Sequence, residues 1–218
     1  MSRKLRQEVI ERMKISPHKV MVISIGLNLD KYTSKSFHER GDAILHVGTR
    51  VTKNLPTTLK AFNIIAKYDP RVRLYIVGNR NTALECVEKY VRDEIRHRII
   101  ILGAIPRQEL KEIYSRIKVT LIPSTYEAFS YVALESMASG TPIVASSTLP
   151  FEVIIDEFNG FIVQDPYDYK SFADRVITLL SNEDIWCKLS SNALKHVRIY
   201  DIESIAEKYI TLIRKLST

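Results

Sequence analysis

The sequence predicts an α/β fold: a single Rossmann-like, doubly wound parallel sheet with helices on both faces. Three observations predict it. Short apolar runs alternate with amphipathic helical stretches along most of the 218 residues. Most of these runs lack the apolar–polar alternation of a strand with one solvated face, so both faces of the sheet must be covered. Several runs end at a glycine, at the carboxyl edge where such sheets bind ligands.

The N-terminal elements precede the regular series. Apolar residues recur at helical spacing in residues 3–14, which predicts an amphipathic helix. The apolar run VMVISI at residues 20–25 predicts a strand. Residues 27–41 are polar and irregular, which is typical of a connector. We therefore expect residues 1–41 to form a helix, a strand and a hinge-like connector beside the main domain.

The main domain is expected over residues 42–200, and a C-terminal helix over residues 201–218. The first and last helices of the chain each have an apolar face, which we expect to pack on this domain; the alternative is a surface for a partner chain. The expected strands are 44–48, 74–78, 99–103, 119–122, 142–145 and 161–163. The expected helices are 56–67, 82–94, 107–116, the segment between Ser130 and Gly140, a short turn near 151–155, 167–181, 183–197 and 201–216.

Composition excludes several function classes. No apolar run reaches the length of a membrane span and the N-terminus lacks an apolar signal core, so we expect a cytoplasmic protein. Cys86 and Cys187 lack metal-ligand spacing and are expected to be reduced packing residues. The net charge is +7, but no helix-turn-helix, basic aromatic sheet face or zinc spacing supports nucleic-acid binding. The cations of the first helix are better explained as a solvated face than as membrane or partner docking: Arg3, Lys4, Arg6, Arg12 and Lys14.

Two glutamates, Glu127 and Glu135, flank the expected start of the helix that follows Ser130. Glu127 lies in the loop after a strand, where it can accept from sugar hydroxyls or stabilise developing positive charge. The alternative is a first-turn glutamate that only favours the helix dipole. Glu135 lies in an otherwise apolar helix, where a buried carboxylate needs a partner such as a ribose diol. The alternative is a surface glutamate on the outer face of the helix.

The expected helix start between these glutamates is a candidate phosphate site. Ser130 is expected to cap the helix, and the backbone amides of Phe129, Ser130 and Tyr131 to point at a bound phosphate. Capping alone would also explain Ser130, but a cap uses only one or two of the free donors. Gly140 is expected to end the helix, with Pro142 just beyond it. A carboxylate, a free helix end and a second carboxylate suit a ligand with a sugar, a phosphate and a ribose.

A second cluster lies in the run GTRVTKN at residues 48–54, between an expected strand and helix. Arg50 and Lys53 follow the carboxyl end of the strand, and an Arg fork with a Lys point charge suits a diphosphate. Taken alone, these two cations are better explained as solvated loop residues. The run lacks the GxxxxGK[ST] spacing, so it does not predict a P-loop.

Together these segments resemble the retaining glycosyltransferases with the GT-B fold, and most closely the glycogen-synthase-like and mannosyltransferase-like group called family 4. The run EAFSYVALESMASGTPIVA at residues 127–145 resembles the E-x7-E signature of that family. Three further segments, in the same order, resemble its hinge, its diphosphate loop and the loop whose backbone reads the base: SIGLNLDKY at 24–32, GTRVTKN at 48–54 and ILGAIP at 101–106. The resemblance covers only the C-terminal, donor-binding domain and the segment leading into it, so we expect one half of a GT-B fold.

The resemblance implies roles for the candidate site residues. Glu135 would hold the ribose hydroxyls, and Glu127 would contact the donor sugar near the reacting face. Arg50 and Lys53 would neutralise the diphosphate leaving group, helped by the amides of residues 129–131. Ser124, Gly103 and Ile105 complete the expected donor site. Catalysis would consist mainly of positioning and electrostatic stabilisation, and neither a metal nor another cofactor is expected, since the chain has no Asp-x-Asp motif.

Some positions depart from the family pattern. Ala128 and Ser130 replace frequent glycines, Asn28 replaces the hinge aspartate, and Arg50 lies closer to Lys53 than is usual. Two functions remain open. The first is a retaining hexosyltransferase, or its donor domain, that uses a UDP- or GDP-sugar. The second is a non-catalytic nucleotide-sugar-binding module. Expected partners are a nucleotide-sugar, an acceptor-domain chain or a second copy, and a peripheral membrane contact, but no nucleic acid.

Overall fold

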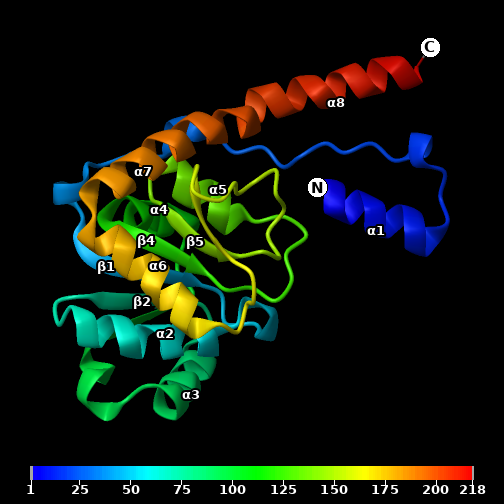
Figure 1. Ribbon diagram of the computed structural model, residues 1–218. Coiled ribbons are helices and arrows are strands. Elements are labelled where there is room, and N and C mark those ends of the chain that lie inside the picture. Colours follow the sequence, from blue (N-terminus) through cyan, green and yellow to red (C-terminus); the bar gives the residue numbers. More distant parts are fainter. Residues whose placement is uncertain (1, 218) are drawn as a thin grey trace.

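A computed structural model describes residues 2–217; Met1 and Thr218, the outer limits of the expected terminal segments, lie outside the described residues. One six-stranded sheet forms the centre, in the order β3-β2-β1-β4-β5-β6, and every neighbouring pair is parallel (Figure 1). The predicted single, doubly wound parallel sheet is therefore confirmed. The strands are β1 Gly41–Val47, β2 Arg73–Val77, β3 Ile99–Gly103, β4 Ile117–Ile122, β5 Ile143–Ser146 and β6 Gly160–Val163.

Helices cover both faces of the sheet. Along β1, Ile44 faces the cluster under α2, α3 and α6, whereas its neighbours Ala43 and Leu45 face the cluster under α4. α5 lies on the α4 side, and α7 contacts both α5 and α6. The α-helices are α1 Arg3–Met13, α2 Leu55–Tyr68, α3 Arg80–Tyr90, α4 Arg107–Arg116, α5 Tyr131–Ala138, α6 Tyr169–Ser181, α7 Glu183–Val197 and α8 Ile202–Leu216. The short 3-10 turns are Pro17–Lys19, Leu29–Lys31, Phe37–Glu39, Val51–Lys53, Asp93–Arg98 and Arg198–Tyr200.

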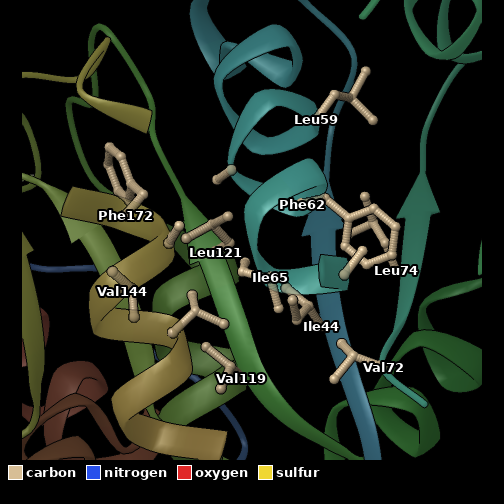
Figure 2. Packing of buried hydrophobic residues seen from close by; sticks show 14 of the residues in the cluster. Ile44, Leu59, Phe62, Ile65, Val72, Leu74, Val119, Leu121, Val144 and Phe172 are labelled. Carbon is tan, nitrogen blue, oxygen red and sulfur yellow. The ribbon is translucent and has the colours of Figure 1, made fainter. Parts of the chain in front are cut away.

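The largest core cluster lies between the sheet and the α2–α6 layer. Figure 2 shows Phe62 of α2 beside Leu74 of β2 and Ile65 of α2 beside Ile44 of β1. Phe172 of α6 belongs to the same cluster, on the same face of the sheet. All six residues of β4 are buried. Strands that are covered on both faces have no solvated side, which explains why the sequence shows continuous apolar runs rather than alternation.

Three local expectations are wrong. Residues 20–25 form no strand, because an apolar run becomes a strand only where a neighbouring strand receives its hydrogen bonds. Residues 151–155 form a single hydrogen-bonded turn rather than a helix, and the Asn159 side chain closes it by bonding to Val153 O and Ile155 N. The helix expected to reach residue 94 ends at Tyr90, whose carbonyl accepts a hydrogen bond from Asn63.

The terminal helices pack on the domain far less than expected. α1 buries no residue completely, and α8 buries only Ile205. On α8, Tyr209, Ile210 and Ile213 are 50%, 47% and 61% exposed, and the helix projects beyond the sheet (Figure 1). Helical periodicity identifies an apolar face but not the surface that covers it. Among residues 2–217, no helix combines the length and apolar character needed to cross a bilayer.

The connector between α1 and β1 is fastened to the main domain by Arg40. Its buried guanidinium donates to the carbonyls of Tyr114, Ile117 and Ser139 and to the Thr141 hydroxyl. Burial lowers the pKa of Arg40 to about 10. This value is still well above 7, so the side chain is charged at neutral pH. These bonds satisfy carbonyls at the end of α4 and α5 and hold the connector beside them.

Candidate functional site

The site lies where the chain reverses its direction across the sheet. β1 and β4 are neighbours, but the chain leaves β1 for α2 on one face and β4 for α5 on the other. Loops that diverge in this way leave a crevice at the carboxyl edge, and open α/β sheets bind ligands there. Lys53 follows β1, and Glu127 follows β4, so both sequence-predicted charges lie at this edge of the sheet.

Glu127 is buried and ion-paired. Its Oε1 atom accepts from the Lys53 ammonium and, at 3.0 Å, from the Ser124 hydroxyl. Both side chains of the ion pair are largely enclosed, with 16% of Lys53 and 7% of Glu127 exposed. Asn54 fixes the Lys53 loop, because its side-chain amide donates to Pro123 O at 3.1 Å and to Pro166 O at 2.7 Å. The structure thus brings together three predicted residues, in a pairing of Lys53 with Glu127 that the sequence did not indicate.

A buried histidine of β1 holds the start of this loop through hydrogen bonds. His46 Nε2 lies 2.8 Å from Gly48 O, and the Thr58 hydroxyl lies 2.8 Å from Nδ1. A carbonyl can only accept, so Nε2 carries the proton, and in the neutral ring that burial favours, Nδ1 accepts from the Thr58 hydroxyl. Burial lowers the pKa of His46 to about 4. Gly48 has φ +102° and leaves no room for a Cβ beside the Lys53 side chain, so this turn requires glycine.

The N-terminus of α5 lies between the two glutamates in sequence and carries free donors. Ser130 caps the helix as expected, since its hydroxyl oxygen accepts from Ala133 N at 3.3 Å. Among residues 2–217, no hydrogen bond is recorded from the amides of Phe129, Ser130 or Tyr131. The Phe129 ring packs edge-on against Tyr200, so only its backbone is available to a ligand. An eight-residue helix with free amides is electropositive at this end and favours an anion.

The C-terminus of α5 is fixed as well. Gly140 has φ +64°, Gly140 N donates to Met137 O, and Thr141 N donates to Ser136 O. This pair of bonds is a Schellman motif, in which glycine takes the left-handed position. A Cβ at Gly140 would come within 2.3 Å of Ser34 Oγ in the connector. The helix is therefore anchored at both ends, which holds Glu135 at a defined depth.

Glu135 is buried and meets partners from two distant segments. Its Oε1 accepts from Arg107 Nε at 2.7 Å and from the Tyr32 hydroxyl at 3.2 Å. Burial acts to lower the pKa of Arg107, but the hydrogen bond and charge of Glu135 outweigh it and raise the pKa. The pKa of Tyr32 is raised by burial and by the same carboxylate. The alternative of a surface glutamate on the outer helix face is wrong.

The remaining predicted residues are more dispersed. Arg50 is exposed, makes no ion pair recorded among residues 2–217, and lines a cavity of about 400 Å³ that also includes Asn54 and Thr125. Gly103 ends β3 with φ +77°, and Ile105 packs against the cluster under α4. Gly103 has open space where a Cβ would point, which leaves its backbone approachable. Within the described chain, no three His, Cys, Asp or Glu side chains form a group that suits a metal ion.

Sequence reasoning missed three residues that shape the site: His46, Arg107 and Tyr32. A histidine inside the apolar run of β1 was a visible signal, because a buried polar side chain needs partners. Tyr32 occupies a hinge position that is usually Phe in the family that the sequence resembles, and its additional hydroxyl was a second signal. Arg107 gave none, since charged residues are ordinary in the first turn of a helix.

Comparisons with known proteins identify the family of the chain. Residues 30–196 match a family model described as "Glycosyl transferases group 1". A D-inositol 3-phosphate glycosyltransferase from Corynebacterium urealyticum is 31% identical over 164 residues, which cover 72% of this chain and 39% of that protein. An uncharacterized glycosyltransferase from Methanocaldococcus jannaschii is 28% identical over 226 residues, which cover 97% of this chain and 58% of that protein.

Solved structures show the same fold. HepE from Anabaena, crystallised with UDP and glucose, superposes with a TM-score of 0.85 at 18% sequence identity. The superposition covers 98% of this chain and 61% of HepE. At this identity, the likeness supports the fold alone. The chain thus spans roughly two-fifths to three-fifths of the length of the proteins that it resembles.

Proposed function

Because the chain belongs to the group 1 glycosyl transferases, we propose that it is the donor-binding half of a retaining glycosyltransferase. In this proposal, a hexose moves from a nucleoside-diphosphate sugar to an acceptor. One observation carries the proposal: a helix start with free amides, bounded by two buried glutamates whose charges are already compensated, at the switch point of a parallel sheet.

Each part of the donor has a proposed contact. The diphosphate lies against the amides of Phe129, Ser130 and Tyr131 and against the Lys53 ammonium. An ammonium has three donors, so Lys53 can bond to Glu127 and to a phosphate oxygen at once. Glu127, oriented by Ser124, faces the donor sugar. The ribose reaches Glu135, and the base lies near the backbone of Gly103 and Ile105. Arg50 adds a solvent-exposed charge from the loop surface.

The proposed chemistry is electrostatic. As the bond from the anomeric carbon to the diphosphate oxygen breaks, negative charge grows on the leaving phosphate and positive charge on the sugar ring. Lys53 and the α5 amides stabilise the phosphate, and the Glu127 carboxylate stabilises the ring. These groups are in place before the reaction, which lowers the cost of reorganisation. A metal-free mechanism and a cytoplasmic location remain predictions.

Calorimetry with UDP, GDP and ADP tests the donor site. At least one diphosphate should bind, and Glu135→Gln should weaken it by about tenfold, the value of one charge-assisted hydrogen bond to a ribose hydroxyl. Glu112→Gln is the matched control, since Glu112 is an exposed α4 glutamate whose carboxylate pairs with Arg116. Failure of all three nucleotides to bind at millimolar concentration would contradict the proposal.

The alternative function is a nucleotide-sugar-binding module without turnover. The free amides at the start of α5 and the buried Glu135 would serve such a module equally well. A transfer assay with the 218-residue protein tests whether these residues turn over by themselves. We expect nucleotide binding with little transfer, because these residues span only part of the length of the relatives. Efficient transfer to a defined acceptor by the isolated chain would overturn the half-enzyme description.

We also propose that the exposed apolar face of α8 binds an acceptor domain. The face presents Tyr209, Ile210 and Ile213, and each is about half exposed or more. Light scattering over a range of concentrations should find a monomer, because the proposed occupant is a different chain or domain. A stable dimer that Ile213→Asp dissociates would assign the face to a second copy instead. Sedimentation with anionic vesicles would assign it to a membrane surface.

A further inference from the structure

The two recorded hydrogen bonds to Glu135 share one oxygen. Arg107 Nε and the Tyr32 hydroxyl both donate to Oε1, at 2.7 Å and 3.2 Å. No hydrogen bond to Oε2 is recorded among residues 2–217. A carboxylate accepts through both oxygens, so Oε2 keeps acceptor capacity that Arg107 and Tyr32 do not use. The two donors fix Oε1, and the other polar group beside the carboxylate is the buried Tyr114 hydroxyl of α4.

α4 holds this arrangement with two cations. Arg107 and Lys111 are one turn apart and lie on the same face of α4. The Arg107 guanidinium bonds to Glu135 and lies 5.1 Å from the centroid of the Tyr131 ring, which is one turn before Glu135 on α5. The Lys111 ammonium lies 5.1 Å from the centroid of the Tyr32 ring. Arg107 thus contacts α5 at two points, and Lys111 holds the tyrosine that supplies the second donor.

The surroundings of Glu135 give its carboxylate few other anchors. Its neighbours on α5, Ala133, Leu134 and Met137, are fully buried. The Tyr114 phenol of α4 is also buried beside this carboxylate, and burial, the Glu135 charge and hydrogen bonding to Glu135 raise its pKa. An ionised carboxylate in such a place needs fixed donors. The identified donors come from α4 and from the connector, not from α5 itself.

We propose that Arg107 and Tyr32 are positioning residues for ribose recognition: they hold Oε1 of Glu135 so that Oε2 accepts from the ribose hydroxyls. The inference rests on the proposed function and deepens it. Arg107 and Tyr32 act through Glu135, and neither is a catalytic residue. The connector that carries Tyr32 is thereby part of the donor site.

The test compares UDP with 2′,3′-dideoxy-UDP by calorimetry; if GDP or ADP binds better, the matching pair is used. The wild type should prefer the ribose form by about tenfold, as expected for a charge-assisted hydrogen bond. In Arg107→Met the preference should fall to about twofold, and in Tyr32→Phe to about threefold to fivefold. Affinity for the dideoxy form should stay unchanged in both, which shows that the rest of the site is intact. Arg116→Met, at the exposed end of the same helix, should keep the full preference.

Two results would overturn the inference while leaving the donor site standing. One is a full ribose preference in Arg107→Met. The other is tighter UDP binding in that variant, which would mean that Arg107 competes with the ribose. If no nucleotide binds, the proposed function fails, and a second readout still decides the contact itself. The NMR signal of Arg107 Nε–H should shift in Glu135→Gln and in Tyr32→Phe but not in Arg116→Met; no shift in Glu135→Gln contradicts the inference.

Discussion

Glu127 and Glu135 are the same residue type, are equally buried and flank the same helix start, but they are held in different ways. Glu127 is paired with Lys53, which follows the strand next to its own, and with Ser124, three residues earlier. Glu135 is paired with Arg107, which follows the edge strand β3, and with Tyr32 in the connector. The first cluster is local to the switch point, whereas the second joins segments from across the domain.

The two cations also differ in exposure. Lys53 is 16% exposed, but Arg107 is 55% exposed. Water can therefore screen the Arg107 charge, although Glu135 itself is buried, whereas water has little access to either partner of the Lys53–Glu127 pair. This difference suggests that the Glu127 cluster contributes more to stability and that the Glu135 cluster contributes mainly to orientation.

The largest expected effect is a difference in unfolding free energy between a Lys53 variant and an Arg107 variant. Lys53→Met leaves the buried Glu127 carboxylate without its cation, which should cost about 3–5 kcal/mol of unfolding free energy. Arg107→Met should cost about 1 kcal/mol, because an ion pair of which more than half of one partner is exposed is screened by solvent. Urea unfolding measures both.

The double variant Lys53→Met with Glu127→Gln is the control for the first substitution. Removing both charges removes the unpaired buried carboxylate, so most of the lost stability should return. Equal costs for Lys53→Met and Arg107→Met would contradict the proposed difference between the clusters.

The second effect concerns pH and the Lys53 loop. The pKa of His46 is about 4 in the folded protein, against a usual value near 6.5, because burial disfavours the charged ring. Between these values the unfolded chain binds more protons, so stability falls as the pH falls through this window. From pH 7.5 to pH 5 the loss due to His46 should be about 2 kcal/mol.

Unfolding measured across that range checks the sign. The measurement ends at pH 5 so that it reports on His46 and not on Asp69 or Asp168. Hydrogen bonds lower the pKa values of these two carboxyls, which therefore take up protons only at lower pH. His46→Gln should flatten the dependence, while the exposed control His97→Gln should keep it. A wild-type curve with no slope in this window would contradict a neutral, buried His46.

The smallest effect concerns the helix start between the glutamates. Ser130→Ala removes the acceptor of the Ala133 amide and should cost about 1 kcal/mol. Ser130→Asn keeps a capping oxygen and should recover most of the loss. If the two variants are equally destabilised, the cap is not what stabilises the start of α5.

The fold, and the edge of the sheet at which Lys53 and Glu127 lie, were accessible from sequence for physical reasons, although their ion pair was not. Buried parallel strands have no solvated side, so their apolar runs are continuous, and Lys53 and Glu127 each follow one of two strands that a doubly wound sheet places together. The bounds of α4 were also predicted, at Arg107–Arg116. Such features depend on local periodicity and on the order of elements.

The Glu135 cluster was not accessible in the same way. Periodicity predicts that α4 forms, but not that its first residue contacts α5. The position of Tyr32 depends on an irregular connector, which Arg40 holds by bonds to carbonyls far away in sequence. The same limit explains the errors over residues 20–25 and on α8, where an apolar pattern was visible but its partner was not.

The central claim is that the α5 start and its two glutamates bind a nucleoside diphosphate. Backbone NMR during titration with UDP, GDP or ADP tests it most directly. The account predicts the largest shifts at the amides of Phe129, Ser130 and Tyr131, with further shifts at Lys53 and Glu135 and none along α8. A nucleotide that binds but shifts other parts of the chain, leaving these amides unchanged, would contradict it.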